Sequence, residues 1–215
     1  MDPALYVILD RGAARGRDLV DLLAAAIAGG CRMVQLREKE WPSGQLLPLA
    51  ERLRARCAAD GVTFIVNDRV DLALAVHADG VHLGQDDLPA RVARPLLRPG
   101  MILGVSTHDV GQARAALADG ADYIAVGSMF PTPTKPAFQL VGPGLIRKLR
   151  AEIPVPLVGI GGITHDNVRE VIGAGADGVA VISAVDAAAD PRAACERFLG
   201  LIRAARGLTT PGSSL

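Results

Sequence analysis

The chain has 215 residues, of which half are hydrophobic and 3% aromatic, and its formal net charge is zero. This composition fits one sizeable domain with a core of Ala, Val, Leu and Ile. The balanced charge argues against nucleic-acid-binding and membrane-surface proteins, because both classes carry a basic face. The sequence shows no secretory signal and no apolar run near the ~20 residues of a membrane span. Three widely spaced cysteines suit free thiols in a reducing compartment, so we expect a cytoplasmic protein.

Short apolar segments typical of strands recur at residues 5–9, 33–36, 63–66, 80–83, 102–105, 123–126, 155–158 and 178–182. The stretches between them are rich in Ala, Leu and Arg and have helical spacing. Strands that alternate with helices indicate a parallel sheet of the α/β class. Eight such units, without a Gly-x-Gly-x-x-Gly motif after the first, favour a single-domain (βα)8 TIM barrel over an open dinucleotide-binding sheet. We expect the barrel to cover residues 1–206 and residues 207–215 to form a disordered tail.

Polar clusters follow the second, third and fourth predicted strands. Arg37 and Lys39 are compatible with a solvated loop or with a phosphate site. Asp68 and Asp87 could each cap a helix, but carboxylates at adjacent strand ends also suit Mg2+ held together with substrate phosphates. The carboxyl ends of barrel strands converge on one face, so we expect the two carboxylates to be neighbours. His82 is expected inside the barrel as a hydrogen-bonded core residue rather than as a metal ligand.

Further polar segments follow the later strands. Ser106 could donate to a phosphate or cap the next helix. The loop at residues 130–136 contains three prolines, two threonines and Lys135, which indicates either a rigid turn or a binding loop. Glycine-rich residues 159–163 and residues 181–184 follow the last two strands, where barrels often bind phosphate through backbone N–H groups. Together with the carboxylate pair, these segments predict a diphosphate substrate with a metal and a second phosphorylated substrate.

The combination of these motifs resembles the thiamine phosphate synthase family, also called thiamine-phosphate pyrophosphorylases. The likeness spans about residues 5–205, and its motifs appear in the family order. The motifs are Gln35-Leu36-Arg37-Glu38-Lys39, Val66-Asn67-Asp68, Gly80-Val81-His82-Leu83-Gly84-Gln85-Asp86-Asp87-Leu88, Gly104-Val105-Ser106, Thr132-Pro133-Thr134-Lys135-Pro136, Gly159-Ile160-Gly161-Gly162-Ile163 and Val181-Ile182-Ser183-Ala184.

The resemblance implies a Mg2+-dependent transferase. It would join 4-amino-2-methyl-5-(diphosphooxymethyl)pyrimidine to thiazole phosphate through a pyrimidine carbocation, giving thiamine phosphate and pyrophosphate. The implied contacts to the pyrimidine diphosphate are Gln35, Leu36, Arg37, Glu38, Lys39, Asn67, Ser106 and Lys135, of which Arg37, Lys39, Ser106 and Lys135 would be catalytic. The implied contacts to the thiazole phosphate are Thr132, Pro133, Thr134, Gly162, Ile182 and Ser183. Asp68 and Asp87 would hold the metal.

Two departures from the family pattern and three rival functions accompany this resemblance. Ser128 stands where the family more often has proline, which makes the thiazole contacts less secure, and His77 replaces a small residue.

A thiazole tautomerase-like paralogue or a phosphosugar isomerase would need an acid–base pair instead of the metal set. A non-catalytic barrel that binds a phosphate ligand would release no pyrophosphate. The expected partners are small molecules, with no nucleic acid and no membrane, and a homo-oligomer is compatible with the sequence.

Overall fold

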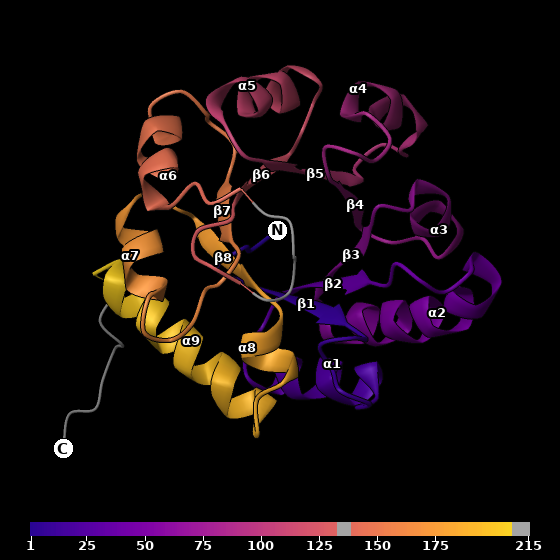
Figure 1. The fold of residues 1–215 in the computed structure, drawn as a ribbon. Coiled ribbons are helices and arrows are strands. Elements are labelled where there is room, and N and C mark those ends of the chain that lie inside the picture. The colour runs from indigo at the N-terminus through magenta and orange to yellow at the C-terminus, as the bar shows by residue number, and fades with distance from the viewer. Residues whose placement is uncertain (133–138, 208–215) are drawn as a thin grey trace.

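The computed structural model describes residues 1–132 and 139–207. Eight parallel strands close into a barrel in the order β1-β2-β3-β4-β5-β6-β7-β8, with the helices in an outer ring (Figure 1). The strands are β1 (Leu5–Asp10), β2 (Met33–Arg37), β3 (Thr63–Asn67), β4 (Gly80–Leu83), β5 (Ile102–Thr107), β6 (Tyr123–Gly127), β7 (Leu157–Ile160) and β8 (Gly178–Val181). The predicted single-domain TIM barrel is confirmed. The predicted residues Pro133, Thr134 and Lys135 and nearly all of the predicted tail lie outside the described residues.

The helices follow the strands in the expected alternation. They are α1 (Leu19–Ala28), α2 (Ser43–Asp60), α3 (Val70–Ala75), α4 (Ala90–Ala93), α5 (Val110–Ala118), α6 (Pro143–Arg150), α7 (Val168–Gly173), α8 (Ser183–Asp186) and α9 (Pro191–Ala205), with the 3-10 helix η1 (Arg94–Leu96) after α4. Aspartate side chains cap the N-termini of α1, α5 and α9. Asp18, Asp109 and Asp190 each accept a hydrogen bond from a backbone N–H in the first turn. Such caps satisfy backbone donors that have no partner inside the helix.

The seventh strand begins two residues later than predicted. The apolar run starts at Val155, but the strand starts at Leu157. Pro154 and Pro156 flank Val155, and a proline has no N–H to give to a neighbouring strand. The Pro156 carbonyl still accepts from the Ile124 N–H at 3.0 Å. The strand can therefore pair on both sides only after the second proline.

Side-chain alternation produces two hydrophobic cores. Outward-facing residues such as Leu36 and Phe64 pack beneath the helices. Inward-facing residues fill the barrel, namely Tyr6, Ile8, Met33, Ile65, Tyr123, Val158 and Ala180. The barrel interior is thus packed and not a pore, and the functional site of such a barrel is expected at the carboxyl ends of the strands.

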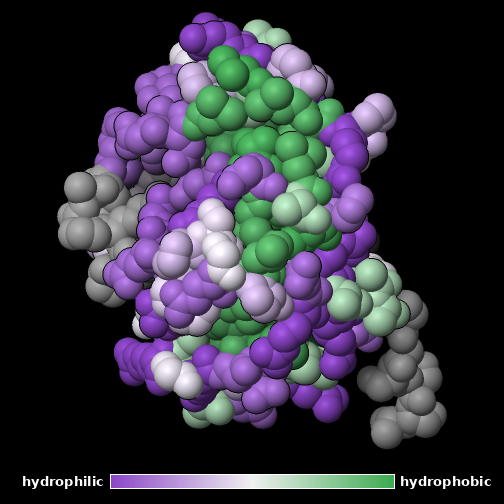
Figure 2. All heavy atoms as spheres, turned by 90° about the vertical axis from the view of Figure 1, so that its right-hand side faces the viewer, coloured by the Kyte–Doolittle hydropathy of each residue, from purple (hydrophilic) through white to green (hydrophobic). Residues whose placement is uncertain are grey.

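One side of the molecule also exposes apolar side chains. The right-hand side of Figure 1, which carries α2, α3 and α4, shows a band of hydrophobic residues between hydrophilic ones (Figure 2). Leu88, Val92 and Leu96, before or within α4 and η1, are the exposed large hydrophobic residues of this segment. In the described ranges, no helix has both the length and the apolar character needed to cross a membrane. Cys31, Cys57 and Cys195 are buried free thiols, as expected.

Candidate active site

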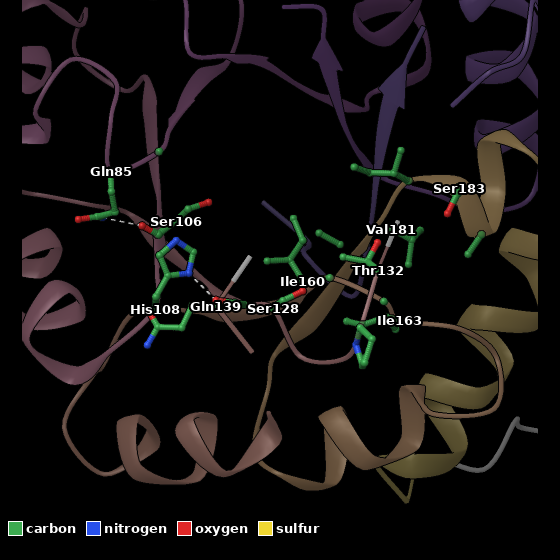
Figure 3. Close-up of a pocket in the computed structure, with 18 of the residues that line it drawn as sticks. Gln85, Ser106, His108, Ser128, Thr132, Gln139, Ile160, Ile163, Val181 and Ser183 are labelled. Carbon is green, nitrogen blue, oxygen red and sulfur yellow. Dashed lines mark hydrogen bonds between the residues drawn. The ribbon is translucent and has the colours of Figure 1, made fainter. Parts of the chain in front are cut away.

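A cavity of about 450 Å³ lies at the carboxyl ends of the strands. Gln85, Ser106 and His108 lie on one side of it, and Ile163, Val181 and Ser183 lie on the other (Figure 3). The predicted site residues that line it are Lys39, Asp87, Ser106, Thr132, Gly162, Ile182 and Ser183. Segments from opposite ends of the chain therefore share one cavity because the barrel brings its strand ends together.

Two carboxylates and one ammonium group form a cluster at the edge of this cavity. The side chains of Asp68 and Asp87 are hydrogen-bonded to each other. Lys39 Nζ lies 2.9 Å from Asp68 Oδ2, and the Gly84 N–H donates to Asp87 Oδ2 at 2.7 Å. Asp68 has a left-handed backbone, with φ of 61°, which is uncommon for a residue other than glycine. Such backbone conformations cluster at functional sites.

The two carboxyl groups of this cluster have pKa values shifted in opposite directions. Burial raises the pKa of Asp68, and the neighbouring Asp87 raises it further, while Lys39 opposes both effects. Burial also acts to raise the pKa of Asp87, but hydrogen bonds from Asp68 and the Gly84 N–H outweigh it and lower the pKa. The pair therefore favours the protonated form at Asp68 and the ionised form at Asp87. Joint ionisation of two carboxylates this close is disfavoured, and a bound cation would relieve that repulsion.

The carboxylate pair fits a hard divalent cation. Its oxygen donors are the type that Mg2+ prefers, and Mg2+ is usually held by one or two carboxylates together with substrate phosphates and water. Residues 1–132 and 139–207 contain no group of three or more His, Cys, Asp or Glu side chains suited to a metal. A closed metal site built by the protein alone is therefore not seen there, whereas an open site completed by a substrate is compatible with the pair.

The segment from Gln35 to Lys39 does not act as one unit. Lys39 lines the cavity, but Arg37 is paired with the Asp10 carboxylate and Glu38 lies 2.6 Å from Arg11 Nε. Gln35 is buried inside the barrel, and Leu36 is buried beneath the helices. Gln35 to Glu38 are thus absent from the cavity lining in this structure. The predicted Asn67 is likewise not a lining residue; it pairs in register with His82.

The other side of the cavity is shaped by glycine. Gly161 and Gly162 follow β7 with φ values of 95° and 66°. A Cβ atom on Gly162 would lie 2.5 Å from the Pro131 carbonyl oxygen and 2.7 Å from that of Phe130. Only glycine lets the turn after β7 lie this close to the segment after β6. The Asn167 side chain donates to the Gly162 carbonyl at 3.0 Å and holds the turn in place.

Other polar side chains that line the cavity carry no role predicted from the sequence. Gln85, His108, Ser128 and Gln139 are among them. Gln85 donates to the Ser106 carbonyl at 2.7 Å, and His108 Nδ1 is hydrogen-bonded to the Gly127 carbonyl. Both could have been found by position, because each follows a strand end that already carries a predicted residue. Ser128 donates to the Phe130 carbonyl at 3.1 Å, so the position that departs from the family pattern supports the segment after β6.

Comparison with known proteins decides the family. Residues 5–185 match the family model described as thiamine monophosphate synthase. The chain belongs to this family. A thiamine-phosphate synthase of Moorella thermoacetica is 51% identical over 204 residues, which cover 94% of this chain and 97% of the relative. One of Methanospirillum hungatei is 46% identical over 203 residues, covering 94% and 98%.

A solved structure agrees with these relatives. The thiamine phosphate pyrophosphorylase from Pyrococcus furiosus superposes with a TM-score of 0.87 at 38% identity, covering 95% of this chain and 97% of the other. Thiamine-phosphate synthases are transferases. The resemblance drawn from the sequence motifs is therefore confirmed, both for the family and for its barrel fold.

Proposed function

We propose that this chain is a thiamine phosphate synthase that joins 4-amino-2-methyl-5-(diphosphooxymethyl)pyrimidine to thiazole phosphate. The contact between Asp68, Asp87 and Lys39 carries the proposal, because it lies at the edge of a cavity that extends to the glycine turn after β7. One region offers charge for a diphosphate, and the other offers backbone groups for a monophosphate. The family of the chain supports the same reaction.

The metal of this reaction would be Mg2+, held by Asp68 and Asp87. When bound, Mg2+ supplies positive charge to the diphosphate leaving group. Lys39 stands beside the pair and adds a fixed positive charge at the same place. Its ammonium is half exposed, so it can move from Asp68 toward a phosphate oxygen.

Side chains around the diphosphate would stabilise the charge that develops as it leaves. The bond between the pyrimidine methylene carbon and the diphosphate oxygen breaks, and its electron pair stays with pyrophosphate. Ser106, Lys39, Arg37 and Lys135 would supply hydrogen bonds and positive charge to that oxygen. Arg37 would first have to leave Asp10, and Lys135 belongs to the loop outside the described residues.

The second substrate would use the uncharged side of the cavity. Thr132, Gly162, Ile182 and Ser183 line it and would bind the thiazole phosphate together with Pro133 and Thr134. The thiazole nitrogen donates its electron pair to the pyrimidine carbocation, so no general base is needed. Holding the two partners in line can supply up to ~7–11 kcal/mol of the reduction in barrier height.

The proposal also covers the cellular compartment, the partners and the bounds of the catalytic domain. We propose a cytoplasmic enzyme with small-molecule substrates, whose catalytic domain is residues 1–206. The three buried free thiols support a reducing compartment.

Incubation of the purified chain with both phosphorylated substrates and Mg2+ tests the function. A synthase releases pyrophosphate and forms a product that gives thiochrome on oxidation. A thiazole tautomerase would change the thiazole phosphate without the pyrimidine diphosphate. A binding protein would retain a phosphate ligand and release no pyrophosphate. Either of these last results would contradict the proposal.

A further inference from the structure

A chain of hydrogen bonds crosses the barrel interior and ends at the cavity. It starts at Gln35, whose amide nitrogen donates to the Tyr6 hydroxyl at 2.5 Å. The hydroxyls of Tyr6 and Tyr123 lie 3.0 Å apart, and the Tyr123 hydroxyl lies 2.8 Å from His82 Nδ1. His82 Nε2 then lies 2.8 Å from Ser106 Oγ. Of these five residues, Ser106 alone lines the cavity (Figure 3).

The backbone leaves space for this chain of hydrogen bonds. His82 on β4 is in register with Gly104 on β5, and Gly104 is in register with Tyr123 on β6. A Cβ atom on Gly104 would overlap the ring of Tyr123, so this glycine opens the space through which Tyr123 reaches His82. The two rings are stacked, with centroids 5.5 Å apart and an interplanar angle of 27°. The glycine of the motif Gly104-Val105-Ser106 therefore serves the contact.

The hydrogen bonds of this interior chain have a preferred donor-to-acceptor direction. In the amide orientation that the structure gives Gln35, Nε2 faces Tyr6 and can only donate, so the Tyr6 oxygen accepts one hydrogen bond from it. If Tyr123 also donated to Tyr6, the buried Tyr6 hydrogen would have no acceptor among the described residues, at a cost in free energy. With Tyr6 donating to Tyr123 and Tyr123 donating to His82 Nδ1, both phenol hydrogens have an acceptor. His82 then carries its proton on Nε2 and donates to Ser106.

This direction fixes what Ser106 can do. Its oxygen accepts from His82, so its own hydrogen is left to point into the cavity. A donor with a fixed orientation is suited to a phosphate oxygen, and a preoriented donor needs no rearrangement when charge develops. Burial raises the pKa of both Tyr6 and Tyr123, so the two phenols stay neutral and keep their hydrogens in the chain.

We propose that His82 is a positioning residue which, through Tyr123, Tyr6 and Gln35, holds the Ser106 hydroxyl as a donor to the diphosphate of the pyrimidine substrate. The proposal rests on the proposed function for the identity of the ligand. His82 is not among the described residues that line the cavity, so its proposed role acts through Ser106. The four residues behind Ser106 therefore set the strength of a contact that they do not make.

A double-mutant cycle between Tyr123 and Ser106 tests the coupling. Tyr123→Phe removes one hydroxyl far from the cavity lining and keeps the ring, and we expect kcat to fall roughly tenfold. In a Ser106→Ala background, Tyr123→Phe should cause no further fall, because the group that it orients is gone. Equal falls in the two backgrounds would mean that Tyr123 is merely structural and would overturn the proposal. Ile65→Val, in the same interior cluster, is the control and should act equally in both backgrounds.

Two further measurements keep the proposal separate from the proposed function. Long-range ¹⁵N correlation spectra of the wild-type protein should show the His82 proton on Nε2, and a proton on Nδ1 would overturn the proposal. The same mutant cycle can be measured by the affinity for pyrophosphate with Mg2+, which requires no turnover. If the wild type forms no thiamine phosphate but the cycle in pyrophosphate affinity is non-additive, the proposed function fails and the positioning role stands. An additive cycle in affinity overturns the positioning role.

Discussion

The two sides of the cavity are built from different kinds of groups. The side after β3 and β4 uses charged side chains, Asp68, Asp87 and the nearby Lys39. The side after β7 and β8 uses the backbone of Gly161 and Gly162 and the hydroxyl of Ser183. We propose the charged side for a diphosphate with a cation and the backbone side for a single phosphate. Loss of charge should therefore damage the first side, and added volume should damage the second.

The largest effect should come from Asp87→Ala. We expect a fall of roughly a thousandfold in kcat, because the cation loses one of two carboxylates and the leaving group loses its charge partner. Affinity for thiazole phosphate, measured by calorimetry, should stay unchanged. Asp71→Ala removes an exposed carboxylate from α3 and is the matched control. Full activity of the Asp87 variant in the presence of a chelator would refute the metal assignment.

Gly162→Ala probes the other side of the cavity. The added methyl group would collide with the carbonyls of Pro131 and Phe130 at a residue with positive φ, so the turn after β7 must move. We expect the KM for thiazole phosphate to rise by ~10²-fold, as for a displacement of about 1 Å at a binding site, with Mg2+ affinity unchanged. Gly200→Ala in α9, where a methyl group meets no atom, should leave both quantities as they are. An equal loss of Mg2+ affinity would show that the two sides are not separate.

Asp186 is buried in α8 beside the end of β1, and it predicts a pH dependence of stability. Burial raises its pKa from 3.8 to about 8, while the Asp10 N–H donates to Oδ2 at 2.9 Å and opposes the shift. The folded state therefore binds more protons than the unfolded state between these values. The free energy of unfolding should fall as pH rises through this window, by a few kcal/mol at most.

Asp186→Asn should remove this decline, because the amide cannot ionise and its oxygen can still accept from Asp10. Urea unfolding between pH 5 and pH 9 measures the difference, which should be small at pH 5 and largest at pH 9. Asp166→Asn, an exposed site, provides the control. A wild-type stability that rises across this range would contradict the assignment.

The smallest effect should come from Ser183→Ala. The hydroxyl lines the cavity at the start of α8, and its loss removes one donor from a site that backbone groups also supply. We expect the KM for thiazole phosphate to rise roughly tenfold with kcat nearly unchanged. A larger effect on kcat than on KM would place Ser183 in the chemical step and not in ground-state binding.

The sequence predicts the meeting of Asp68 and Asp87, since barrel topology alone brings the ends of β3 and β4 together. It also predicts that His82 points inward. It does not predict that Arg37 pairs with Asp10, because that contact depends on the register of β1 with β2. The hydrogen bonds behind His82 are equally hidden, since Tyr6 and Tyr123 are 117 positions apart and meet only in the closed barrel. Contacts set by topology can be predicted, and those set by register and side-chain packing cannot.

The interior polar chain limits how the molecule can be divided. Its members come from β1, β2, β4, β5 and β6, so a fragment that stops before β6 would contain His82 and Tyr6 but not the Tyr123 oxygen that joins them. Such a half-barrel would keep buried polar groups without their partner and would lack a correctly directed Ser106. Splitting or permuting the gene inside this span should therefore cost more than doing so between β6 and β8.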